Sequence, residues 1–128
     1  MIAALAFLLA VADEDAPKRV AVERLDLSSD QVDVGACTTR LLGRSAKVQN
    51  YPVRDGVGLD WTPKTGLFMS APGDPVVAME FRRDDRGPYL QVLYRHPFSA
   101  AATRKVTEKA AKTCFAEDWK RWQATAPR

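Results

Sequence analysis

Few side chains in this sequence are of the types that commonly carry out chemistry. The single histidine, His96, lies in the stretch YRHPFS, where Ser99 follows it by three residues. A histidine can serve as a general base for a hydroxyl nucleophile, but such partners are recognised by their geometry and not by their spacing. We favour an interpretation in which His96 ends a strand and hydrogen-bonds to a loop backbone. The alternative is a small hydrolase-like enzyme in which His96 works with a carboxylate from a neighbouring strand.

Two other patterns fall short of binding motifs. Asp84 and Asp85 lie in RRDDRG, a composition typical of a hairpin turn in which the flanking arginines neutralise the acids. Gly56 and Gly58 lie in RDGVGLD, which lacks the GxGxxG pattern of phosphate loops and the acid spacing of an EF-hand. We expect these glycines to permit a bulge or a twist at the start of a strand. Because the sequence also has no CxxC motif and no Cys/His cluster, we predict no metal site and no cofactor.

Two tryptophans flank two basic residues from Trp119 to Trp122, in a chain whose net charge is only +3. Such a mixture suits a nucleic-acid strand or a membrane surface. However, the two tryptophans are spaced i, i+3, as packed residues on one helix face are. We interpret the basic residues as the solvated side of a helix. We predict no nucleic-acid partner and no stable membrane insertion of the mature chain.

The chain begins with an uncharged run of eleven residues, Ile2 to Ala12, followed at once by the acidic stretch DEDAP. This run is too short to span a bilayer but fits the apolar part of a secretory signal, with small residues at Ala10 and Ala12 for cleavage. One feature disagrees with a secretory signal: such signals carry positive charge before the apolar part, and here no Lys or Arg precedes the run. We predict a signal peptide over residues 1–12 and a periplasmic or secreted protein. The alternative is a cytosolic interaction domain that keeps this run as an N-terminal helix.

The only two cysteines are Cys37 and Cys114. In an exported protein, two cysteines are most simply explained by one disulfide. In a cytosolic protein they would be two free thiols in the core. We predict the disulfide, because each cysteine lies on the apolar stripe of a predicted helix.

Helical periodicity occurs near both ends of the mature chain. The first predicted helix follows Asp30, a good N-cap, and ends at Gly43, which we expect to supply a left-handed stop. The second follows Ser99 and continues to about Gln123. The apolar stripe of the first helix is Val34, Cys37 and Leu41, and that of the second is Ala102, Val106, Ala110, Cys114, Phe115, Trp119 and Trp122.

The middle of the chain alternates with the period of strands. Short turn-rich links separate four runs, which indicates an antiparallel meander with one covered face. These runs are GVGLDWT (56–62), LFMSA (67–71), VVAMEFRR (76–83) and YLQVLYRH (89–96). Residues 18–27 alternate weakly, as either an edge strand or an extended lead-in would.

These elements predict an α+β fold, a two-layer sandwich in which an N-terminal and a C-terminal helix cover one face of a four-stranded antiparallel sheet. Both cysteines would then lie in the helical layer, side by side. We expect an extended lead-in over residues 13–29, a single domain over residues 30–124, a disordered tail over residues 125–128, and a monomer.

The other face of the predicted sheet would be open to solvent. It would carry residue types that are enriched in protein interfaces, and we predict binding there. The predicted binding residues are Glu80, Arg82, Tyr89, Gln91 and Arg95, with Asp60 and Phe68 nearby. An ordinary wet sheet face, with cross-strand pairs such as Glu80 with Arg95, is the simpler alternative. We therefore predict a non-enzymatic protein-interaction or inhibitor-like module whose protein partner is unknown.

Overall fold

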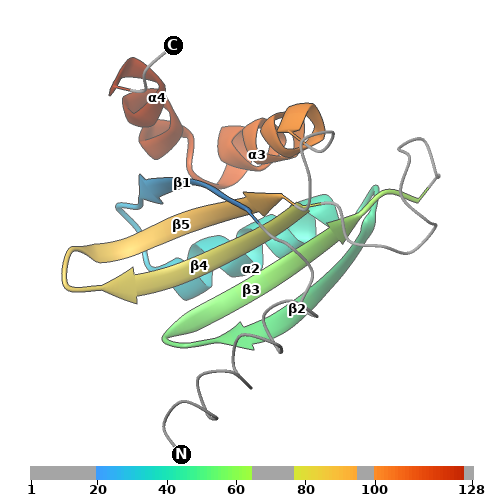
Figure 1. The fold of residues 1–128 in the computed structure, drawn as a ribbon, viewed down its shortest axis with the longest axis horizontal. Helices are drawn as coiled ribbons and strands as arrows, with labels where there is room; N and C mark the ends of the chain where they lie inside the picture. Colours follow the sequence, from blue (N-terminus) through green and yellow to red (C-terminus); the bar gives the residue numbers. More distant parts are fainter. Residues whose placement is uncertain (1–19, 65–76, 95–99, 126–128) are drawn as a thin grey trace, which may run out of the picture.

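The computed structural model describes residues 20–64, 77–94 and 100–125, in which three helices cover one face of a five-stranded sheet (Figure 1). The strand order is β1-β5-β4-β3-β2, and every neighbouring pair is antiparallel. The elements are β1 (Val20–Asp26), α2 (Gln31–Leu42), β2 (Lys47–Val53), β3 (Gly56–Thr62), β4 (Val77–Asp84), β5 (Gly87–Tyr94), α3 (Ala100–Cys114) and α4 (Ala116–Thr125).

The predicted α+β fold class is confirmed, but the sheet has five strands rather than four. Strand β1 lies within residues 18–27, for which the sequence left open an edge strand or an extended lead-in, and it is an edge strand. Strand β2 was not predicted, because its sequence KVQNYPV does not alternate regularly and contains Pro52. Proline cannot donate to a ladder, so it is confined to sheet edges, which is where β2 lies. The run predicted as a strand over residues 67–71 lies outside the described residues.

Helix α2 begins as predicted but ends differently. The carboxylate of Asp30 accepts hydrogen bonds from the backbone N–H groups of Val32 and Asp33, at 3.0 and 3.3 Å. At the other end, Gly43 is in the right-handed region with φ −66°, so the predicted left-handed stop is wrong. Its N–H instead donates to the carbonyl of Thr39 at 3.0 Å, which closes the last turn without a left-handed residue.

The C-terminal helix is interrupted, where one continuous helix was predicted. Helix α3 ends at Cys114, Phe115 is buried at the break, and α4 continues to Thr125. Helix α4 packs against β1, where the buried carboxylate of Asp118 accepts hydrogen bonds from the backbone N–H and the hydroxyl of Ser28, at 3.1 and 2.5 Å. The break redirects the chain toward this edge of the sheet.

The core lies between the helices and one face of the sheet. Helix α2 packs on β3 and β4, and α3 packs on β5. In Figure 1, α2 lies behind the sheet and α3 lies above it. Gly35 lets α2 approach closely, since a Cβ there would lie 2.5 Å from a methyl of Val57 and 3.2 Å from the ring of Phe81. The most completely buried strand residues all point to this face: Leu59, Val77, Met79, Phe81 and Leu90.

The predicted disulfide is present and joins the two helices of this layer. Cys37 of α2 and Cys114 of α3 are bonded, with their Cα atoms 5.8 Å apart and a sequence separation of 77. Trp119 and Trp122 of α4 stack at a centroid distance of 5.0 Å and pack against the same core. Among the described helices, none has the length and apolarity needed to cross a bilayer.

The disulfide should be a major contributor to stability. Cross-linking a loop of this length is worth about 4–5 kcal/mol in the chain-entropy model, and removing native disulfides typically costs about 2–5 kcal/mol. We expect replacement of both Cys37 and Cys114 by Ser to lower the free energy of unfolding by about 2–4 kcal/mol in urea titrations. The reduced natural chain serves as the control and should unfold like the double variant. A loss below about 1 kcal/mol would contradict the assigned role.

Candidate functional site

The open face of the sheet is the side that points away from the helices. The strand register aligns one row of residues across all five strands of this face: Tyr51, Gly58, Glu80, Gln91 and Arg24. The next row includes Arg82, Tyr89 and Asp26. Four of the five predicted binding residues therefore share this face, while Arg95 and Phe68 lie outside the described residues.

The first of two side-chain bridges on the open face begins at the β2 edge. The ring of Tyr51 lies over Gly58, where an added Cβ would come within 2.3 Å of it. The Tyr51 hydroxyl donates to Glu80 Oε2 at 2.9 Å, and Arg82 Nη1 donates to Glu80 Oε1 at 3.3 Å. The edge tyrosine thus reaches across β3 to an acid on β4. The register places Gln91 opposite Glu80, and Arg95, the expected cross-strand partner, lies outside the described residues.

Of the bulge or twist predicted at Gly56 and Gly58, the bulge is absent, because the register of β3 with both neighbours is regular. These glycines instead allow neighbouring groups to approach the backbone of β3 closely. Gly58 seats the Tyr51 ring, and a Cβ at Gly56 would lie 1.8 Å from the carbonyl oxygen of Phe81. The bulge of this sheet is in β1, between Ala21 and Glu23.

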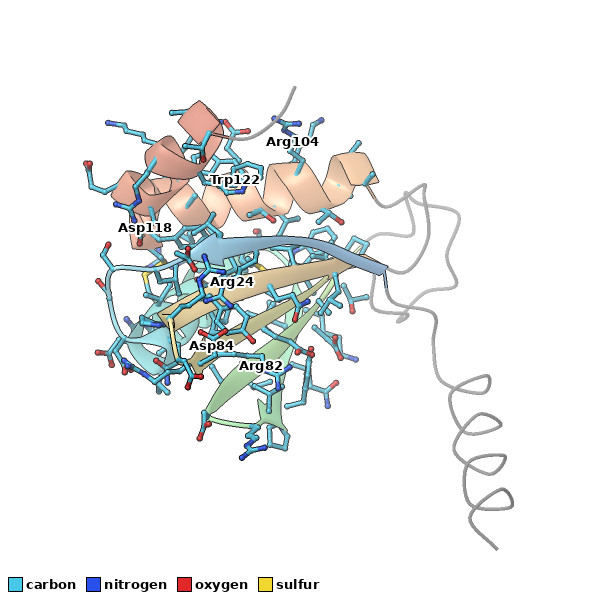
Figure 2. The ribbon with its side chains drawn as sticks, turned by 60° about the vertical axis from the view of Figure 1, so that its left-hand side comes forward. Arg24, Arg82, Asp84, Arg104, Asp118 and Trp122 are labelled. Atoms are coloured by element: carbon cyan, nitrogen blue, oxygen red, sulfur yellow. A yellow bond between two sulfur atoms is a disulfide. The ribbon has the colours of Figure 1, made fainter. Side chains whose placement is uncertain are left out.

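The second bridge begins at the opposite edge, on β1. The guanidinium of Arg24 lies 4.0 Å from the ring centroid of Tyr89 and donates to both carboxylate oxygens of Asp84, to Oδ1 at 2.9 Å. Its Nε also donates to Asp26 at 2.9 Å, and Arg86 donates to the other oxygen of Asp26 at 3.2 Å. Figure 2 shows Arg24, Asp84 and Arg82 close together, apart from Asp118 and Trp122 on α4.

The acid pair Asp84–Asp85 is only partly as predicted. Asp85 lies in the turn, but Asp84 is the last residue of β4, and the cation that binds it is Arg24, sixty positions away, rather than a flanking arginine. The hydrogen bonds from Arg24, with one from the Arg86 backbone, lower the pKa of Asp84 to about 2. In return, the hydrogen bonds to Asp84 raise the pKa of Arg24 above its ordinary value.

The acids of the open face are engaged by neighbouring side chains. Glu80 accepts hydrogen bonds from Tyr51 and Arg82, and Asp84 accepts them from Arg24. Within residues 20–64, 77–94 and 100–125, no three side chains of His, Cys, Asp or Glu converge as metal ligands. His96 lies outside the described residues. Among the described residues, the open face is a charged and aromatic surface.

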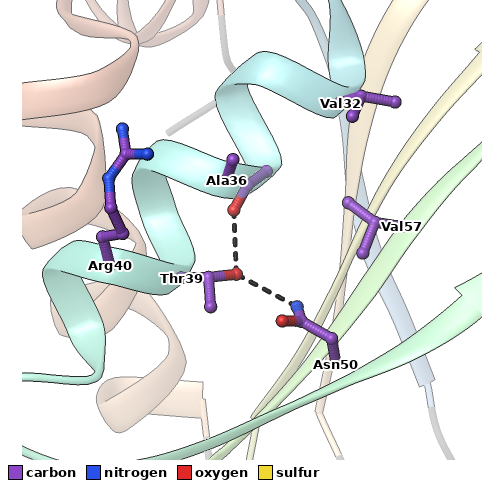
Figure 3. Close-up of a pocket in the computed structure, with 7 residues that line it drawn as sticks. Val32, Ala36, Thr39, Arg40, Asn50 and Val57 are labelled. Atoms are coloured by element: carbon purple, nitrogen blue, oxygen red, sulfur yellow. Dashed lines mark hydrogen bonds between the residues drawn. The ribbon is translucent and has the colours of Figure 1, made fainter.

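A second surface was not predicted from the sequence. A shallow groove of about 300 Å³ runs between α2 and the β2–β3 hairpin, lined mainly by Val32, Ala36, Thr39, Arg40, Asn50 and Val57 (Figure 3). We call it the edge groove. The Asn50 amide donates to the Thr39 hydroxyl at 3.0 Å and to the Gly58 carbonyl at 3.1 Å, which ties the strand to the helix at its base. The only sequence signal for this groove is Val32, which lies off the core stripe of α2 and is 50% exposed.

Comparisons of this chain with models of protein families, with curated proteins and with solved structures find no match.

The Arg24–Asp84 pair should make stability depend on acid pH. A carboxyl whose pKa is lowered in the folded state stabilises the fold above its unfolded pKa of about 3.9, and this contribution is lost as the pH falls toward 2. In the Arg24→Gln variant we expect NMR titration to show the Asp84 pKa rising toward its ordinary value, with a shallower loss of stability between pH 4 and pH 2. Arg104→Gln on α3 is the matched control and should leave Asp84 unchanged. An unaltered Asp84 pKa in Arg24→Gln would contradict the pair.

Proposed function

We propose that this chain is an exported, non-enzymatic domain that binds a partner protein through the open face of its sheet. Its place of action would be a bacterial periplasm or the extracellular space. The observation that carries this proposal is the pair of side-chain bridges, which fix tyrosine and arginine side chains on the face that the helices leave uncovered.

Fixed aromatic and arginine side chains suit protein recognition for a physical reason. Tyrosine and arginine are enriched among the residues that contribute most to binding energy. A side chain that is already held in one conformation loses less entropy when a partner binds. Arg24 stacks on Tyr89 while it is bound to Asp84, and Tyr51 is held between Gly58 and Glu80. The open face is therefore organised before any partner arrives.

Export is supported by two independent features. The apolar run over residues 2–12 has the length of a secretory signal core and precedes an acidic stretch. The bond between Cys37 and Cys114 is of a kind that persists in oxidising compartments and is rare in a reducing cytosol. A cytosolic form with two free thiols would lose the covalent link between α2 and α3.

Site-specific crosslinking in the compartment where the protein resides would test the binding surface. We expect a photoreactive amino acid at Gln91, in the central row of the open face, to capture one defined partner. The same group at Lys105, an exposed position on α3, is the matched control and should not capture it. The Arg82→Glu variant should abolish the crosslink from Gln91, whereas Lys105→Glu should not. Equal capture from both positions, or capture that survives Arg82→Glu, would contradict docking on this face.

A further inference from the structure

We propose that the edge groove takes an extended acidic peptide of a partner protein, which adds a strand to the outer edge of β2. This surface is separate from the open face and would contact a different part of a partner. Peptides that add a strand gain main-chain hydrogen bonds for affinity and use alternate side chains for specificity. The edge of β2 provides partners for the main-chain hydrogen bonds, and the flank of α2 provides contacts for the alternate side chains.

The outer edge of β2 has backbone groups available for pairing. β2 is the last strand of the sheet, with β3 as its one neighbour among the described strands. Opposite residues in an antiparallel pair alternate between exchanging two hydrogen bonds and exchanging none. Pro52 has no N–H to donate, so its pair with Val57 is one that exchanges no hydrogen bonds. Asn50 and Val48 lie two and four positions before Pro52, so their pairs with β3 exchange no hydrogen bonds either. The N–H and C=O groups of Val48 and Asn50 therefore point outward.

The flank of α2 beside this edge carries a row of exposed side chains. Val32, Ala36 and Arg40 recur every four residues, so they lie one above another along the helix (Figure 3). Eight helical residues span about 12 Å, close to the roughly 13 Å between residues i and i+4 of a strand. An added strand can therefore place an apolar side chain against Val32, a small one against Ala36, and a third side chain at Arg40.

Charge determines what the third side chain must be. Arg40 lines this groove, and Arg44 and Lys47 follow it in the chain between α2 and the start of β2. All three are exposed, and no ion pair is formed by any of them within the part of the chain that the structure describes. A carboxylate four residues from the apolar side chain would bind Arg40 with both oxygens. A second copy of this chain is a poor occupant, because its β2 strand, KVQNYPV, contains no acidic residue that could face Arg40.

A short peptide tests the proposal on the oxidised chain. The probe is Thr-Val-Thr-Ala-Thr-Glu-Thr, used with its reversed sequence because the added strand can run in either direction. The control is Thr-Val-Thr-Ala-Glu-Thr-Thr, which moves the acid to the other face of the strand. We expect one of the two probes to protect the amides of Val48 and Asn50 from hydrogen exchange in NMR spectra. The amides of Gln49 and Tyr51, which already face β3, should keep their protection unchanged.

Two variants test the role of charge. Arg40→Gln should weaken binding of the probe by about tenfold, whereas Arg104→Gln, an exposed arginine of α3, should leave it unchanged. The proposal is overturned if neither probe protects Val48 and Asn50, if the control peptide binds equally well, or if both variants weaken binding equally. Protection of the same amides by self-association, seen as a dimer in sedimentation without any peptide, would also overturn it.

Discussion

The disulfide between Cys37 and Cys114 holds the helical layer together, and the two proposed surfaces depend on that layer. Helices α2 and α3 come from opposite ends of the described chain, and their covalent link keeps both on one face of the sheet. The close approach of α2 at Gly35 sets the helix directly on β3 and β4. The largest buried strand residues, Leu59, Met79 and Phe81, are covered from this side, and most of the charged strand residues lie on the opposite side.

The same arrangement explains the different character of the two surfaces. On the open face, residues from both edge strands reach inward to acids on β4, so Tyr51 and Arg24 are fixed by Glu80 and Asp84. The resulting surface is rigid and internally paired. At the edge groove, by contrast, Arg40 is exposed without an ion pair among the described residues, beside a strand with outward backbone groups. We therefore propose a folded partner for the first surface and an extended segment for the second.

Sequence patterns predicted the elements whose signals are local. The cap at Asp30, the two helical stripes and the alternation of β4 and β5 are all confirmed, and the cysteines on those stripes predicted the disulfide. Strand β2 was missed because a strand at a sheet edge can be polar and can contain Pro52. The partners of Asp84 and Gly58 were missed because they come from distant strands: Arg24 lies sixty positions from Asp84, and the Tyr51 ring explains Gly58 only once the register is known. Spacing along the chain carries no information on such contacts.

Mass spectrometry of the protein isolated without reductant from the cells that make it would detect the disulfide itself. We expect a chain that begins at Asp13, contains no thiol open to alkylation, and releases on proteolysis a pair of peptides joined through Cys37 and Cys114. Two freely alkylated cysteines in that protein would contradict the covalent link between α2 and α3, and with it the proposed export.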